Sequence, residues 1–99
     1  MITPQIVEDF KERMHITHNE DENLKRLLSS SYAAIKRDCG EFDIKTSELG
    51  RELVFERTRY VYNDALEFFQ DNFLSELQSF SFSLLPDPVE DEGDTIDQV

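Results

Sequence analysis

Two histidines, His15 and His18, are the first residues whose type and spacing could do chemistry. On one helical turn they could share a metal ion, with a third ligand from the acidic residues 20–22. Structural zinc sites usually include cysteines, however, and the single cysteine, Cys39, lies far along the sequence. The acidic run also lacks the glycine and the closing glutamate of a calcium loop. We therefore expect two surface histidines in a turn, and no metal site.

The cysteine, the serines and the carboxylates are the remaining side chains that could act in catalysis. Cys39 directly precedes Gly40 at the end of a helical pattern, which suits a small packing residue better than a nucleophile. The three serines at residues 29–31 lie within that pattern, where small side chains allow close helix packing. With three glycines, the chain has no loop that could cradle a phosphate. No carboxylate pair is isolated in an apolar segment, so we expect neither an enzyme nor a cofactor.

The charge of the chain is distributed unevenly. The formal net charge is −12, and the last cationic residue is Arg59. Residues 63–99 hold ten acids and no base. Nucleic-acid backbones and anionic membranes attract clustered Lys and Arg, so both are disfavoured as binding partners. The sequence shows no signal-peptide pattern at its N-terminus, and we expect synthesis in the cytoplasm.

Two helices are predicted in the first 40 residues. The first covers residues 4–14, with Thr3 as N-cap and Pro4 at the first helical position. The second begins at Asn19, which forms a capping-box pattern with Glu22, and ends at Gly40 as a left-handed cap. Its predicted buried face comprises Leu24, Leu27, Leu28, Ser31, Ala34 and Ile35.

A long helical region is predicted from Thr46 or Ser47 to Leu77, with two apolar stripes. A second capping-box spacing, Asp64 with Glu67, leaves open whether the region is continuous or breaks near Asn63. The two stripes together are wider than a small core requires. Either this helix is buried on several sides, or part of its surface meets another subunit. The candidate subunit-interface residues are Tyr62, Leu66, Phe69 and Phe73.

Beyond Leu77 the pattern changes. Residues 79–84 alternate serine with apolar residues, which is typical of a strand that pairs either within the fold or with a neighbouring chain. Residues 86–99 are predicted to form an acidic, flexible tail after a helical domain of residues 1–85. The predicted fold is all-α: a small bundle of three to four helices with a long central helix and a short strand-like segment. The candidate docking residues are Phe80, Phe82, Leu84, Leu85 and Pro86.

Three stretches carry a resemblance to a known family. Residues 2–4 (Ile-Thr-Pro), the acidic start of the second helix at residues 20–24, and above all residues 57–69 (RTRYVYNDALEFF) resemble the head–tail connector proteins of long-tailed phages. The last stretch is similar to the branch found in phages of Gram-positive bacteria. The resemblance covers roughly residues 2–85.

The resemblance implies an all-α adaptor, or head-completion protein, that forms a ring of subunits beneath the portal protein. The ring, commonly dodecameric in the family, offers its other side to a stopper or tail-completion protein. DNA passes through the channel without sequence-specific binding, so the expected location is the head–tail interface of the virion. The C-terminal segment becomes ordered on the portal in this family, and the matching positions here begin at Phe80.

An acidic DNA-mimic or inhibitor protein of phage origin is the main alternative. Such proteins arrange carboxylates on a rigid surface to imitate DNA phosphates. Here half of the acids in the base-free segment lie in the predicted tail, at residues 90–97. This placement favours the connector interpretation.

Overall fold

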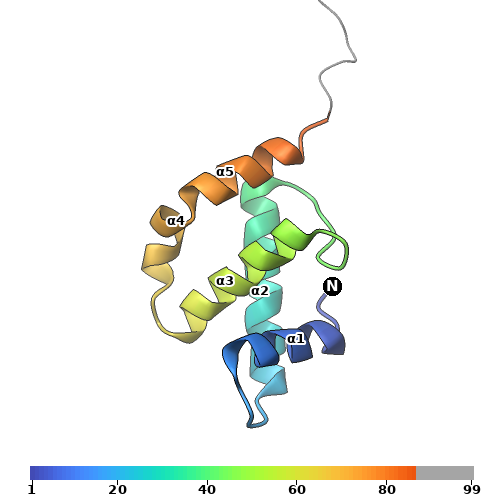
Figure 1. The fold of residues 1–99 in the computed structure, drawn as a ribbon, viewed down its shortest axis with the longest axis vertical. Helices are drawn as coiled ribbons and strands as arrows, with labels where there is room; N and C mark the ends of the chain where they lie inside the picture. Colours follow the sequence, from blue (N-terminus) through green and yellow to red (C-terminus); the bar gives the residue numbers. More distant parts are fainter. Residues whose placement is uncertain (87–99) are drawn as a thin grey trace, which may run out of the picture.

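The computed structural model describes residues 1–86, and the regular secondary structure of these residues is helical. Figure 1 shows α1 (Pro4–Met14), α2 (Asp21–Cys39), α3 (Glu48–Tyr62), the 3-10 turn η1 (Leu66–Phe68), α4 (Phe69–Asn72) and α5 (Leu74–Ser83). The all-α prediction is confirmed, with more and shorter helices than expected. The predicted tail lies almost wholly outside the described residues.

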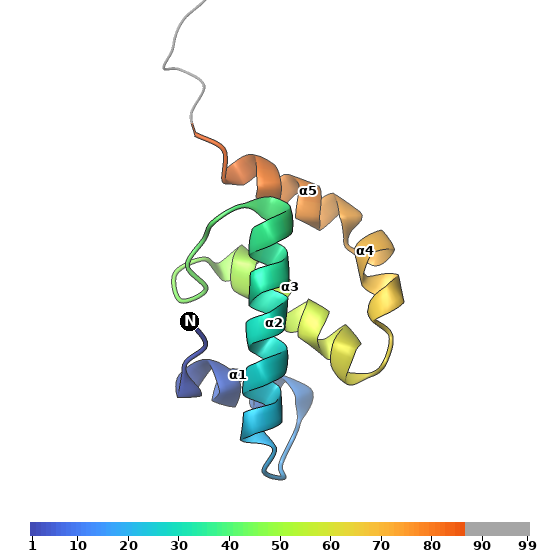
Figure 2. The ribbon, with the colours of Figure 1, turned by 180° about the vertical axis from the view of Figure 1, so that it is seen from behind.

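The central element is α2, not the region after Ser47. It runs along the long axis of the molecule, with α1 at one end, α3 packed beside it, and α5 crossing the other end (Figures 1 and 2). The short η1 and α4 carry the chain from the end of α3 to the start of α5. The helix that starts at Glu48 ends at Tyr62, so the long helical region breaks where the second capping-box spacing allowed it.

The predicted strand at residues 79–84 is wrong. Residues 79–83 form the end of α5, and none of the described residues is in a strand. The alternation of serine and apolar residues conceals a helical spacing, because Leu77, Phe80 and Leu84 lie on one side of a helix. Leu77 and Phe80 are buried and Leu84 packs on the core, so burial of this side selects the helix.

The caps predicted for the first two helices are present in the structure only in part. Thr3 caps α1, since its Oγ1 accepts a hydrogen bond from the Ile6 backbone N–H at 3.3 Å. The predicted capping box at Asn19 is not formed, because α2 begins two residues later, after Glu20. At its far end Gly40 has a positive φ of 128°, as expected of glycine, but its ψ of 172° is not left-handed helical.

The end of α3 explains the break. Asp64 has a left-handed φ of 61°, its N–H bonds the Val61 carbonyl at 3.1 Å, and the Ala65 N–H bonds the Tyr60 carbonyl at 2.8 Å. This pair of bonds is a Schellman motif, which usually has glycine at the left-handed position. Asp64 therefore ends α3, and η1 starts without the predicted capping bond.

The hydrophobic core lies between α2 and the helices around it. Phe10 of α1 meets Phe55 of α3 edge-on, with ring centroids 5.5 Å apart. Phe69 and Phe80 bring the C-terminal helices into the same core. Its buried members are Ile2, Ile6, Val7, Phe10, Leu24, Leu28, Tyr32, Ile35, Ile44, Leu53, Val54, Phe55, Phe69, Leu77 and Phe80.

Three rings, those of Tyr32, Phe42 and Phe80, connect α2, the loop after it and α5; we call them the aromatic clasp. The Phe42 ring stands edge-on to Tyr32 at 5.1 Å and to Phe80 at 5.0 Å. The Tyr32 hydroxyl donates to the Phe42 carbonyl at 2.7 Å and accepts from the Ile44 N–H at 3.2 Å. A Cβ on Gly50 would lie only 2.4 Å from Phe42, so α3 also packs closely on the clasp.

Candidate partner-binding surface

Exposed large apolar side chains gather in the C-terminal part of the described chain. Five of the seven lie on η1, α5 or the residues just after α5; the other two are Met1 and Leu49. Scattered exposed apolar residues are normal, but several on one short segment indicate a binding surface. The five are Leu66, Phe68, Leu74, Phe82 and Leu85.

The structure separates the predicted docking residues into two groups. Phe80 is buried, and Leu84 is half-buried against the core, with its Cδ1 about 3.4 Å from the position of a Cβ on Gly40. Phe82 and Leu85 are 75% and 63% exposed, and Pro86 is also exposed. The first two therefore hold α5 on the fold, while the last three are free to contact a partner.

A helix turns by 100° per residue, which gives α5 two apolar sides. One side carries Leu77 and Phe80 and faces the core. The other, which we call the outer face, carries Phe82 beside a row of residues spaced i, i+4 and i+7, and Leu85 follows this row in the turn just after the helix. No position of the outer face bears a charge. Its members are Leu74, Gln78, Ser81, Phe82 and Leu85.

A shallow groove lies along the outer face and continues onto the end of α2. Its volume is about 410 Å³, and four of its five lining residues belong to the outer face. The fifth is Cys39, whose Sγ lies 3.6 Å from the Leu77 carbonyl oxygen. Cys39 thus packs against α5, as the sequence predicted. It also lines the groove, which the sequence did not predict.

The predicted subunit-interface residues have different positions. Phe69 is buried, and its ring stacks on that of Phe73, with centroids 5.0 Å apart. Tyr60 lies edge-on to both rings, at 5.6 Å and 5.7 Å. The aromatic excess of this region is therefore largely used inside the fold. Of the predicted interface residues, Leu66 is the most exposed.

Phe68 is a surface residue that sequence reasoning missed. It is 57% exposed, whereas its neighbour Phe69 is 3% exposed. Adjacent residues point about 100° apart on a helix, so a short helix packed along a narrow face leaves one of two large neighbours toward solvent, as it does here. The sequence alone shows no signal that separates these two rings, because adjacent residues on other helices, such as Ile6 and Val7, are both buried.

The half-buried Tyr62 joins the end of α3 to the start of α2. Its hydroxyl donates to Glu20 Oε2 at 2.6 Å, and Asn23 donates to Glu20 Oε1 at 3.1 Å. The bond from Tyr62 is the main reason why the pKa of Glu20 is lowered, and the same bond raises the pKa of Tyr62. His18 contacts the same carboxylate at 2.5 Å. This group stabilises the fold where α2 meets α3.

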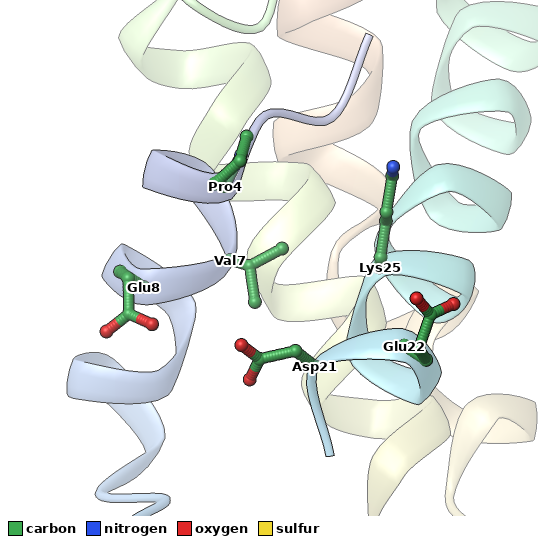
Figure 3. Close-up of a pocket in the computed structure, with 6 residues that line it drawn as sticks. All are labelled: Pro4, Val7, Glu8, Asp21, Glu22 and Lys25. Carbon is green, nitrogen blue, oxygen red and sulfur yellow. The ribbon is translucent and has the colours of Figure 1, made fainter. Parts of the chain in front are cut away.

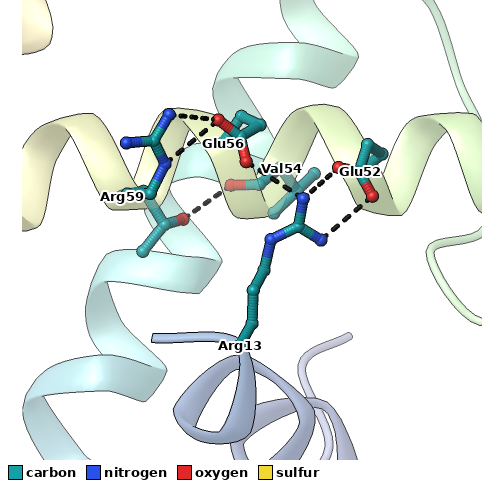
Figure 4. A network of polar contacts seen from close by, with 6 residues as sticks. Arg13, Glu52, Val54, Glu56 and Arg59 are labelled. Atoms are coloured by element: carbon teal, nitrogen blue, oxygen red, sulfur yellow. Dashed lines mark hydrogen bonds and ion pairs between the residues drawn. The ribbon is translucent and has the colours of Figure 1, made fainter. Parts of the chain in front are cut away.

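A charged network joins α1 to α3 (Figure 4). Arg13 contacts both carboxylate oxygens of Glu52, and it also donates to Glu56 Oε2 at 3.0 Å. Arg59 donates to Glu56 Oε1 through Nε at 3.1 Å and through Nη2 at 2.6 Å. The bond with Glu52 is the largest cause of the raised pKa of Arg13, and it lowers the pKa of Glu52. Each carboxylate is neutralised, so the network is structural.

A second hollow, of about 200 Å³, lies between α1 and α2 (Figure 3). Its rim is acidic, but Asp21 bonds Lys11 Nζ at 2.9 Å, which raises the lysine pKa. In residues 1–86, no three His, Cys, Asp or Glu side chains are arranged to hold a metal ion. The lining residues are Pro4, Val7, Glu8, Asp21, Glu22 and Lys25.

The outer face of α5 is therefore the candidate functional site. It is uncharged, three of its five residues are apolar, it lies where the described chain ends, and the fold does not cover it. Among residues 1–86, no helix is long and apolar enough to cross a membrane. Comparison with protein-family models, curated proteins and solved structures gives no match for this chain.

Proposed function

We propose that this chain is a non-enzymatic structural protein, a phage head–tail connector adaptor that binds the portal protein through the outer face of α5. The exposure of Phe82 and Leu85, at 75% and 63%, is the observation that carries the proposal. Leaving these side chains in water costs free energy, and a partner that covers them recovers roughly 1.5–3 kcal/mol for each side chain fully buried. Aromatic residues at the centre of an interface often contribute most of its affinity.

The arrangement of the chain supports this role. The family resemblance of residues 57–69 includes the end of α3 and the turn that directs the chain toward α5. In the proposed ring, Leu66 and Phe68 contact the neighbouring subunit, since they are the exposed large apolar residues of η1, just before the buried Phe69. The other side of the ring receives a stopper or tail-completion protein. The assembled ring belongs to the virion, and DNA passes through its channel.

Mixing the purified protein with portal rings from the same phage tests the proposal directly. We expect electron microscopy to show added density on the portal. The double variant Phe82→Ser with Leu85→Ser should abolish this density, whereas Leu49→Ser, which changes an exposed leucine on α3, should not. Circular dichroism should show native helix content in both variants, because all three side chains are exposed.

Two further results would contradict the proposal or the part of it that concerns the C-terminal segment. Portals without added density, together with competition between this protein and DNA for a nuclease or repressor, would favour the acidic DNA-mimic alternative. Truncation after Leu85 should leave the helical body folded and abolish portal binding, since it removes the candidate docking residue Pro86 and the C-terminal segment that, by the family resemblance, becomes ordered on the portal. Unchanged binding by the truncated chain would refute a role for residues 86–99.

A further inference from the structure

Arg57 of α3 is a half-buried cation with no carboxylate partner in the part of the chain that the structure describes. Its Nη1 donates to the Oγ of the buried Ser31 on α2 at 3.1 Å. Arg13 and Arg59 pair with carboxylates, whereas Arg57 forms no ion pair within residues 1–86. A guanidinium has five N–H donors, and Ser31 accepts from one of them. Arg57 can therefore bind a further acceptor.

The electrostatics around Arg57 favour an acceptor that is negatively charged. Partial burial lowers the pKa of Arg57, and the nearby charge of Arg37 lowers it further. Asp38 acts in the opposite direction with a smaller effect, and its carboxylate contacts Arg37 Nε at 3.2 Å. Two positive charges thus lie near one negative charge. A carboxylate suits such a site, because it can accept two N–H bonds from one guanidinium.

The C-terminal sequence supplies carboxylates in excess. Residues 87–99 hold six Asp or Glu residues and no Lys or Arg. Five of these acids fall between residues 90 and 97. A run of like charges repels itself, so pairing any of its members with a cation elsewhere on the molecule is favourable. The charge of this run complements that of Arg37 and Arg57.

The described chain ends close to the C-terminal end of α2. Helix α5 crosses this end (Figures 1 and 2), and Leu84 Cδ1 lies 3.4 Å from the position of a Cβ on Gly40. Ser31, which binds Arg57, lies roughly 12 Å back along α2 from its last residue, at 1.5 Å per residue. An extended chain covers about 3.3 Å per residue, so residues 90–97 are long enough to reach this position.

Tethering favours the chain's own acids over those of a second copy. An ion pair near the surface is weak, and two separate chains that each carry a net charge of −12 repel one another. A segment joined to the same chain by a short linker has an effective concentration of millimolar order. A weak contact therefore forms within one chain at protein concentrations at which it would not join two.

We infer that Arg57, together with Arg37, binds carboxylates of residues 90–97 of the same chain. The carboxylate accepts from the guanidinium N–H groups that Ser31 does not use. Added salt weakens the contact, because it screens charges that remain partly in water. The contact is independent of the proposed function, since it uses no residue of the outer face.

Neutralising the acids in the full chain tests this contact. The readout is the Nε–Hε signal of Arg57 in NMR spectra, which the variant Arg57→Lys identifies by its loss. A bound carboxylate protects the guanidinium protons, so we expect Hε to exchange with water at least ~3-fold faster in the test variant than in wild type. The test variant replaces four acids by their amides: Glu90→Gln, Asp91→Asn, Glu92→Gln and Asp94→Asn.

A matched control removes the same number of charges from exposed positions of the described chain. We expect wild-type Hε exchange in this control, because none of its four acids belongs to the inferred contact. Equal exchange in wild type and the test variant would overturn the inference, as would equal acceleration in the test and control variants. The control variant carries Glu12→Gln, Glu67→Gln, Asp71→Asn and Glu76→Gln.

Inorganic phosphate at constant ionic strength shows whether the site is already occupied. Because phosphate must displace the acidic segment, we expect it to shift the Arg57 signal with at least ~3-fold weaker apparent affinity in wild type than in the test variant. Equal phosphate affinities would overturn the inference. A wild-type Hε exchange rate that slows as the protein is concentrated would show that a second copy supplies the carboxylate, and would also overturn it.

Discussion

Replacing Glu56 with glutamine tests the charged network between α1 and α3. Glu56 is 9% exposed and accepts three hydrogen bonds from two guanidinium groups, those of Arg13 and Arg59. Glutamine has the same shape but bears one oxygen and one NH₂ group. Whichever way the amide turns, its NH₂ group faces a guanidinium N–H, and a donor then meets a donor.

The expected loss follows from these contacts. Each hydrogen bond to a charged group contributes about 1.5–3 kcal/mol when well buried, and much less when solvent screens it. The Arg13 and Arg59 side chains are 33% and 41% exposed, so we expect Glu56→Gln to lower the free energy of unfolding by about 2 kcal/mol. At about 4–8 °C per kcal/mol for a domain of this size, the Tm should fall by about 8–16 °C.

Glu52→Gln is the matched control, because it makes the same chemical change on the same helix. Glu52 is half exposed and contacts Arg13 alone, so we expect a loss below about 1 kcal/mol. Thermal unfolding followed by circular dichroism at neutral pH measures both variants. Equal losses in the two variants, or an unchanged Tm for Glu56→Gln, would refute the assignment of Glu56 as the centre of the network.

Three further changes test other features of the fold. Asp64→Gly should raise the free energy of unfolding by about 1 kcal/mol in a denaturant titration, because glycine adopts the φ of 61° without strain; a loss would contradict the Schellman assignment. Gly50→Ala should lower it by about 1–3 kcal/mol, because the new Cβ would lie 2.4 Å from Phe42, and a neutral result would show that this ring is free to move. Tyr62→Phe should destabilise the protein most at neutral pH. The difference from wild type should shrink as the pH falls below 4.5 and Glu20 becomes protonated, and as it rises above 10.0 and Tyr62 ionises; a pH-independent difference would exclude this bond.

Helix positions in the first 62 residues were largely predictable because local signals and burial agree there. Thr3 caps α1 as predicted, and Ser47, one of the two expected starts of the next helical region, caps α3; each hydroxyl accepts a hydrogen bond from the N–H three residues on. The N-cap of α2 was misplaced by one residue, at Asn19 instead of Glu20, because several residues of the acidic run could act as cap. Such local signals act within one turn of helix and need no tertiary contact.

The structure of the C-terminal part was harder to predict, because its apolar residues fit both the two-residue period of a strand and the 3.6-residue period of a helix. Phe80 and Phe82 fit both an alternating strand and a helix with one ring inside and one outside. The choice depends on Phe42, which comes from a loop that has no periodic pattern of its own. Likewise, the candidate site could be predicted as an apolar segment near residue 80, but which side chains remain exposed depends on this packing.

The aromatic clasp has a mechanical consequence for a protein that binds a partner at its C-terminal end. A pull applied at Pro86 acts on α5, and the contact of Phe80 with Phe42 passes the load to the loop. From the loop it reaches α2 through the Tyr32 hydroxyl, which bonds the loop at both Phe42 and Ile44. The clasp thus distributes tension across the helix that runs through the centre of the molecule, and α5 does not bear it alone.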